Sequence, residues 1–159
     1  MVDQIDWECE VHRKYQEKNY GCDPSEYISQ KWAFSMVDKC IVLEDDDVPS
    51  VSFFTFCKEM LDRYEQDTRI TMIAGFNNEE ITPDVPYDYF FATTFSIWGW
   101  ASWKRVIDQW DEHYTFLEDT FNMQQLEQLM KERKFRKDFI YMCHRHKENN
   151  KAYYETIFH

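Results

Sequence analysis

The stretch Cys40-Ile41-Val42-Leu43-Glu44-Asp45-Asp46-Asp47 decides how this chain is expected to fold. Its first half is a short apolar run that contains β-branched residues, which is typical of a buried strand. Its second half is four consecutive carboxylates, which would repel one another unless a cation lay among them. In open α/β sheets, ligands bind beyond the carboxyl ends of the strands. The stretch therefore predicts a strand over residues 39–44 with a divalent-metal site at its end.

The acidic run leaves more than one interpretation open. Because side chains alternate along a strand, we expect Glu44 and Asp46 on one face, and Asp45 and Asp47 on the other. An all-oxygen site suits Mg²⁺ or Mn²⁺, which commonly complete their shell with substrate phosphates. Alternatively, the acids could simply precede a helix, whose N-terminus favours negative charge. A phosphatase-like Asp-x-Asp nucleophile, made of Asp45 and Asp47, is a further alternative.

The spacing of apolar residues predicts an α/β fold, with a mixed, mostly parallel sheet and flanking helices. The predicted strands cover residues 39–44, 70–74 and 88–94. The predicted helices cover residues 24–37, 50–66, 101–110, 121–134 and 135–149. Residues 76–87 are rich in acids, prolines and asparagines, which predicts a long surface loop.

Composition excludes several classes of partner. A length of 159 residues with 43% hydrophobic residues is enough for one domain with a real core. A net charge of −12 argues against nucleic acid and anionic membranes, because both attract basic residues. No apolar stretch approaches the roughly 18 residues of a transmembrane segment. The polar N-terminus is unlike a signal peptide, and five cysteines without a CxxC pair favour reduced thiols, so we expect a cytoplasmic protein.

A second motif, over residues 95–103, carries three tryptophans within six positions. Aromatic faces suit the apolar face of a sugar ring, and an indole N–H can donate a hydrogen bond. Trp98 and Trp100 flank Gly99 and are therefore candidates for the wall of a binding site. Trp103 and Trp110 are instead expected in the core, on one face of the helix predicted over residues 101–110.

Four motifs, taken in chain order, resemble those of a glycosyltransferase family. They are Asn19-Tyr20-Gly21-Cys22, Glu44 to Asp47, Ile73-Ala74-Gly75-Phe76-Asn77 and Ile97 to Trp103. The set is similar to that of bacterial hemolytic-protein-like or nucleotide-diphospho-sugar transferases, which have the GT-A fold. The acidic motif is also close to the Glu-Asp-Asp form of N-acetylglucosaminyltransferase I. The resemblance covers about residues 6–112.

The resemblance implies a metal-dependent transfer of a sugar from a nucleotide-sugar donor to a hydroxyl of a glycan acceptor, as in polysaccharide biosynthesis. The metal, Mn²⁺ or Mg²⁺, would stabilise the departing diphosphate. Asp46 resembles the principal metal ligand, beside Asp47. The substrate-binding residues implied are Glu44, Asp45, Trp98, Gly99 and Trp100. If the reaction inverts, Asp119 or its neighbour Glu118 resembles the position of the catalytic base.

The chain departs from this family before the acidic motif. GT-A enzymes carry several strand–helix units there, whereas 43 residues precede Glu44. We therefore expect residues 1–159 to form a single partial domain that lacks the N-terminal nucleoside-binding strands and has weak or no transferase activity by itself. An incomplete sheet would expose an edge strand, through which a homodimer could form. The alternatives are a non-catalytic carbohydrate- or partner-binding remnant and a metal-dependent phosphohydrolase.

Overall fold

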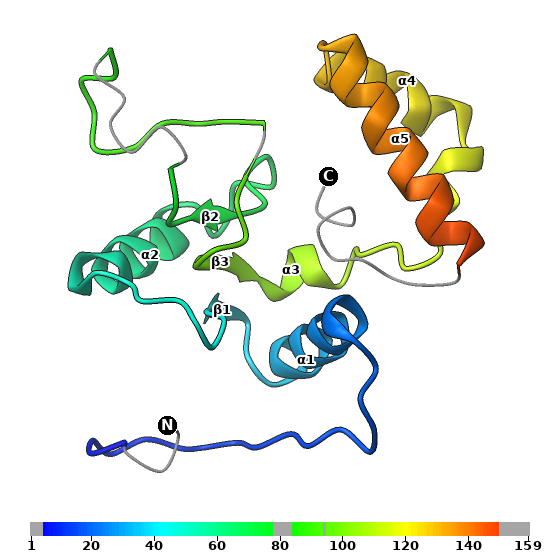
Figure 1. The fold of residues 1–159 in the computed structure, drawn as a ribbon. Coiled ribbons are helices and arrows are strands. Elements are labelled where there is room, and N and C mark those ends of the chain that lie inside the picture. Colours follow the sequence, from blue (N-terminus) through cyan, green and yellow to red (C-terminus); the bar gives the residue numbers. More distant parts are fainter. Residues whose placement is uncertain (1–4, 78–83, 94, 150–159) are drawn as a thin grey trace.

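The computed structural model describes residues 5–77, 84–93 and 95–149. A small sheet lies between helices, and two further helices follow it along the chain (Figure 1). The elements are, in order, α1 (Cys22–Met36), β1 (Lys39–Val42), α2 (Val51–Arg63), β2 (Ile73–Ala74), β3 (Trp100–Trp103), α3 (Lys104–Ile107), the 3-10 helix η2 (Thr115–Glu118), α4 (Thr120–Leu129) and α5 (Arg133–Glu148).

The sheet has the strand order β1-β3-β2, with β3 in the centre. Ala101 pairs with Ile41 on one side and with Ile73 on the other, and both pairings are antiparallel. The predicted combination of helices and a sheet is therefore confirmed, but the prediction of a mostly parallel sheet is wrong. The central strand was predicted as part of a helix. All four residues of β3 are buried, and a strand buried on both faces loses the alternation that distinguishes it from a helix.

The other predicted elements differ from the structure mainly at their ends. The helices predicted over residues 24–37 and 50–66 are confirmed as α1 and α2. Only Ile73 and Ala74 of the second predicted strand pair in the sheet. Just before them, the carbonyls of Ile70 and Thr71 accept hydrogen bonds from side chains, of Arg105 and Ser102, instead of from a strand. Residues 88–93 form no strand, so the prediction of a strand over residues 88–94 is wrong for its described part.

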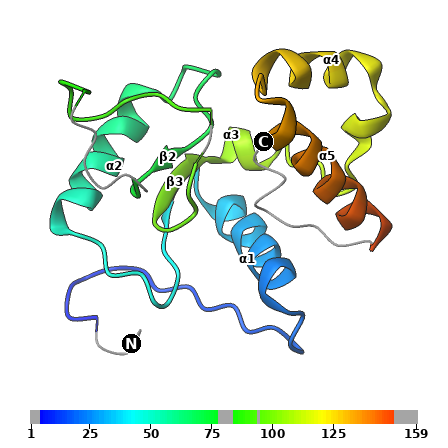
Figure 2. The ribbon, with the colours of Figure 1, turned by 45° about the horizontal axis from the view of Figure 1, so that its top comes forward.

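The helices pack around β3 from opposite sides. Trp100 stacks on Phe34 of α1 with ring centroids 6.5 Å apart. Trp103, whose side chain alternates to the other face, donates a hydrogen bond of 3.1 Å from Nε1 to the Leu61 carbonyl of α2. Figure 2 shows α1 and α2 on either side of the strands. Trp103 and Trp110 are both buried, as predicted, although Trp103 lies in a strand rather than a helix.

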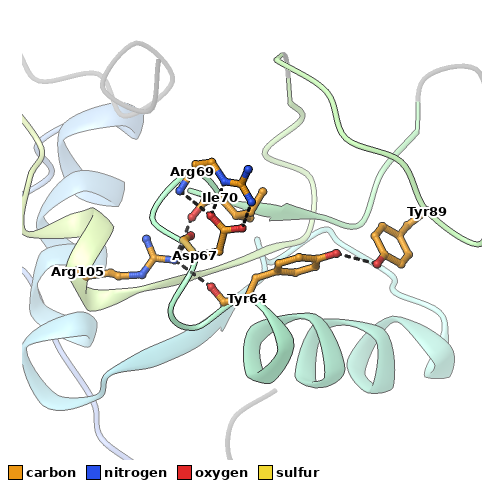
Figure 3. Close-up of polar contacts among 6 residues, drawn as sticks. All are labelled: Tyr64, Asp67, Arg69, Ile70, Tyr89 and Arg105. Atoms are coloured by element: carbon orange, nitrogen blue, oxygen red, sulfur yellow. Dashed lines mark hydrogen bonds and ion pairs between the residues drawn. The ribbon is translucent and has the colours of Figure 1, made fainter.

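Arg105 of α3 fixes the connection between α2 and β2. Its guanidinium lies 4.4 Å from the centroid of the Trp103 ring. It also donates hydrogen bonds of 3.0–3.3 Å to four backbone carbonyls, those of Tyr64, Glu65, Asp67 and Ile70. Figure 3 shows the guanidinium directed into the bend of this connection. One planar cation therefore satisfies carbonyls that the end of α2 and the following turn leave without strand partners.

A second, smaller core is formed by residues of α4, α5 and the segment before them. The two helices run side by side away from the sheet in both views (Figures 1 and 2). The buried members of this core are Tyr114, Leu126, Met130, Phe139 and Cys143. α4 ends at Leu129 with Met130 as its C-cap, and the Glu132 carboxylate accepts a 3.0 Å hydrogen bond from the backbone N–H of Lys134. This cap starts α5 at Arg133, two residues before the predicted start. Within the described ranges, no helix combines the length and the apolar character needed to cross a membrane.

Candidate functional site

The acidic motif forms a turn instead of continuing the strand. β1 ends at Val42, and the chain reverses so that the Asp47 backbone N–H donates to the Glu44 carbonyl at 3.3 Å. The Asp47 carboxylate in turn accepts a 3.0 Å hydrogen bond from the Glu44 backbone N–H. The expected alternation is therefore wrong. Glu44 and Asp45 line one hollow, and Asp46 and Asp47 line another.

The larger of these, here called the Trp98 hollow, has a volume of about 450 Å³. It lies where the turn after β1, the start of α2, the end of β2 and the segment before β3 meet. Its lining residues are Leu43, Asp46, Asp47, Val48, Pro49, Ser50, Phe53, Gly75, Phe76, Trp98 and Gly99. Three of the four motifs found in the sequence therefore contribute to one hollow, although they lie far apart along the chain.

Two glycines bring the strand-end motifs together. The backbone N–H of Gly75 donates a 2.8 Å hydrogen bond to the Gly99 carbonyl. A Cβ atom at Gly75 would overlap the ring of Phe53, which packs against the backbone there. Gly99 has φ +69°, a left-handed conformation that favours glycine. Both glycines are therefore needed for the close approach of backbone and ring that forms the floor of the Trp98 hollow.

Trp98 forms an aromatic wall in this hollow together with Phe76. The two rings meet edge to face, with centroids 4.9 Å apart and planes at 74°. Trp98 is 55% exposed and Phe76 is 41% exposed, so both rings present apolar surface to the solvent. Trp100 lies elsewhere. It is 1% exposed and belongs to the core, so the prediction that it forms the same wall as Trp98 is wrong.

The smaller hollow, here called the Gln30 hollow, has a volume of about 270 Å³ and lies between α1 and the end of β1. It takes in the predicted substrate-binding residues Glu44 and Asp45 and a part of Trp100. Its other lining residues are Ser25, Glu26, Ser29, Gln30, Val42 and Leu43. The sequence motifs gave no indication of the α1 residues, because serine, glutamine and glutamate on a helix face carry no distinctive pattern.

The two residues predicted as the catalytic base lie outside both hollows. Asp119 caps α4, because its Oδ1 accepts a 2.9 Å hydrogen bond from the Asn122 backbone N–H. Glu118 forms an ion pair with Lys147 of α5, which lowers the pKa of the Glu118 carboxyl. Both carboxylates therefore stabilise the second core, and the structure does not bring them to the acidic motif. Spacing along the chain could not predict the position of these two residues, because that position depends on α4 and α5, which follow η2.

Two other carboxylates, Asp111 and Glu112, lie closer to the tryptophan motif along the chain, and both accept hydrogen bonds from neighbouring residues. Asp111 accepts hydrogen bonds from the Thr115 hydroxyl at 2.9 Å and from the Phe116 backbone N–H at 3.1 Å. Glu112 accepts a 2.8 Å hydrogen bond from the Tyr27 hydroxyl of α1. Burial and this bond raise the pKa of Tyr27. These contacts hold the segment after α3 in place and leave neither carboxylate lining the hollows.

The Trp98 hollow offers two carboxylates for a metal ion. Asp46 is exposed, and Asp47 is half-buried with one oxygen bonded within the turn. Among the residues that the structure describes, no three His, Cys, Asp or Glu side chains are arranged to hold a metal. The donor set therefore fits Mg²⁺ or Mn²⁺ that takes one or two carboxylates and completes its shell with phosphates and water. It does not fit a cage built of protein ligands alone.

Comparison of the chain with family models, with curated proteins and with solved structures found no match.

Proposed function

We propose that the Trp98 hollow binds a nucleotide-sugar through Mn²⁺ or Mg²⁺, and that the protein serves in the transfer of that sugar to a glycan hydroxyl. The supporting observation is that Asp46 and Asp47 share one hollow with an exposed aromatic pair, Trp98 and Phe76. A nucleotide-sugar needs both kinds of surface. Its diphosphate needs a cation between itself and protein carboxylates, and its sugar ring packs well on an aromatic face.

The start of α2 supports the position of the diphosphate. Pro49 and the N-cap residue Ser50 line the Trp98 hollow, so the N-terminal end of this 13-residue helix borders it. Unpaired backbone N–H groups and the positive end of the helix dipole favour phosphate groups at such a position. A dication held by Asp46 and Asp47 would supply the remaining positive charge and stabilise a departing diphosphate.

Isothermal titration calorimetry with Mn²⁺ and a panel of UDP-, GDP- and CDP-sugars tests this proposal. We expect binding of one nucleotide class that requires the metal and is abolished by a chelator. Asp46→Asn should weaken it at least tenfold, because the substitution keeps the shape of the side chain and removes a charged ligand. Asp45→Asn is the matched control, since this neighbouring residue lines the Gln30 hollow instead. Equal losses in the two variants would contradict the assignment of Asp46.

A carbohydrate-binding protein without transferase activity is a second candidate, and the exposed Trp98–Phe76 pair is the observation that favours it. In that case, glycan binding would survive the chelator and Asp46→Asn, and would be lost in Trp98→Ala. Release of inorganic phosphate from a simple phosphomonoester, with loss of activity in Asp47→Asn, would instead favour a phosphohydrolase.

A further inference from the structure

We infer that the exposed face of α5 is a docking surface for a membrane that contains anionic phospholipids. This face is here called the α5 stripe, and its exposed residues are Arg133, Lys134, Lys137, Tyr141, His144 and Arg145. The inference does not rest on the proposed transferase function. In both views α5 lies at the other end of the molecule from α2, whose start borders the Trp98 hollow (Figures 1 and 2).

The α5 stripe follows from the spacing of its residues along one helix. Lys134, Lys137 and Tyr141 follow one another at intervals of three and four residues, which places them on one side of α5. Phe139 and Cys143 lie on the opposite side, where they are buried in the second core. The stripe is therefore the side of α5 that the described part of the chain leaves open to the solvent.

Positive charge is concentrated on α5, although the chain is acidic as a whole. The helix carries six lysines and arginines against two acids, Asp138 and Glu148, whereas the whole chain carries 18 against 30. The net charge of −12 argues against an anionic membrane, but it does not describe this distribution. At physiological salt, exposed charges more than about 8 Å apart are largely screened from each other. The charges nearest to a membrane therefore decide whether it attracts the protein.

The cations of the α5 stripe are available to an anionic partner. The ion pairs that α5 forms with other described residues are made by Arg136 and Lys147, on the flank of the stripe. Within the same described residues, Arg133, Lys134 and Lys137 form no ion pair. Lipid phosphates supply the anions that these side chains lack, and each lysine or arginine near an anionic surface strengthens binding about fivefold.

Exposed apolar side chains beside these cations favour a membrane over nucleic acid. Tyr141 is 59% exposed, and the Arg145 guanidinium donates a 3.2 Å hydrogen bond to its hydroxyl. A ring with one polar end suits the boundary between lipid head groups and acyl chains. Met142, next to it in the chain, and Phe121 and Leu129 of α4 are also exposed. Aliphatic side chains gain from contact with acyl chains, whereas the phosphates of a nucleic acid offer them no apolar surface.

Flotation of the full chain with lipid vesicles tests the inference. Vesicles of phosphatidylcholine with about 30% phosphatidylglycerol should bind the protein in 50 mM NaCl, and vesicles of pure phosphatidylcholine should not. An increase to 500 mM NaCl should weaken binding about tenfold or more, because salt screens the attraction. Equal binding to both kinds of vesicle, or no binding to either, would overturn the inference.

Two double variants separate the α5 stripe from the net charge of the protein. Lys134→Gln with Lys137→Gln removes two charges from the stripe and should weaken binding to the anionic vesicles roughly 25-fold. Lys39→Gln with Lys58→Gln removes the same number of charges in β1 and α2, where both lysines pair with Asp62. This control should change binding less than about twofold. Equal losses in the two double variants would show attraction by net charge alone and overturn the inference.

The aromatic residue and the competing partner need their own measurements. Tyr141→Ser should weaken vesicle binding about fivefold, whereas Tyr87→Ser, at another exposed tyrosine, should leave it unchanged. If a DNA duplex binds more tightly than the anionic vesicles, and the double variant of Lys134 and Lys137 loses that binding, the partner is a nucleic acid and the inference is wrong. Circular dichroism shows whether each variant keeps its helices. If Tyr141→Ser does not fold, the double lysine variant decides alone.

Discussion

The ring of Phe53 packs directly on the backbone of Gly75, so closely that even a methyl group at residue 75 would overlap it. Phe53 belongs to α2, and Gly75 follows β2. The contact therefore joins the helix that starts after the acidic turn to the strand end beside Trp98. Both residues line the Trp98 hollow, so their contact fixes part of its shape.

Gly75→Ala should destabilise the protein by about 1–3 kcal/mol, because the new methyl group forces the Phe53 ring out of its position. Urea unfolding followed by tryptophan fluorescence measures this change. The double variant Gly75→Ala with Phe53→Leu is the informative control, since the smaller side chain leaves room for the methyl group. If the two substitutions are additive, the steric explanation is wrong.

Arg105→Met should cost about 2–3 kcal/mol of unfolding free energy, because it removes the guanidinium that donates to four carbonyls after the end of α2. Two of these carbonyls, those of Tyr64 and Asp67, also accept a hydrogen bond from a backbone N–H. Arg69→Met provides a matched control from the same region (Figure 3). The Arg69 side chain is 86% exposed and pairs with Asp67, so its loss should cost less than about 1 kcal/mol. Similar losses of unfolding free energy in the two variants would show that the effect of Arg105 comes from its charge and not from its hydrogen bonds to the carbonyls.

The second core should lose stability in mildly acidic solution through His146. Burial lowers the pKa of His146, whose Nδ1 lies 3.4 Å from the Tyr114 hydroxyl. Asp23 opposes this shift and Arg145 adds to it. The unfolded chain takes up the proton near pH 6.5, and the folded chain does so only at lower pH. Below about pH 6.5 the unfolded state therefore binds more protons, so stability falls as the pH decreases and levels off below the folded pKa.

Amide hydrogen exchange of α5 at pH 7.5 and 5.5, corrected for the intrinsic pH dependence of exchange, measures this loss. His146→Gln should make the stability of α5 less dependent on pH. His144→Gln, at an exposed position on the same helix, should leave the pH dependence as it is. An unchanged pH dependence in His146→Gln would show that a different group is responsible.

The five thiols should differ widely in reactivity toward iodoacetamide at pH 8. Cys57 and Cys143 are fully buried, and burial raises the pKa of each thiol to about 12, so neither should react in the native protein. Cys22 is exposed, but its hydrogen bond to Glu26 raises its pKa to about 11. It should therefore react more slowly than the exposed Cys9.

Mass spectrometry of a time course distinguishes these sites. Glu26→Gln should increase the rate of Cys22 modification and leave that of Cys9 unchanged, because only Cys22 contacts Glu26. In 8 M urea the differences among the cysteines should disappear. Rapid modification of Cys57 without denaturant would instead indicate that α2 opens readily.

Much of the local structure could be predicted from the sequence. The apolar run before the acids, the helix after Pro49 and the core positions of Trp103 and Trp110 depend on neighbouring residues, and the structure agrees with them. Trp98 beside Gly99 is exposed and lines the Trp98 hollow, and its role in binding stays a prediction. Periodicity and turn residues act over short distances along the chain, so these features can be predicted without a fold.

Only the tertiary structure decided which groups share a site. It inserted β3 between β1 and β2, divided the four acids between two hollows, and placed Asp119 and Glu118 at the surface, where they contact α4 and α5. Each of these outcomes depends on hydrogen bonds or packing between residues far apart in the chain, such as Gly75 with Gly99. A local pattern cannot encode them, because the free energy that selects one arrangement arises only when distant segments meet.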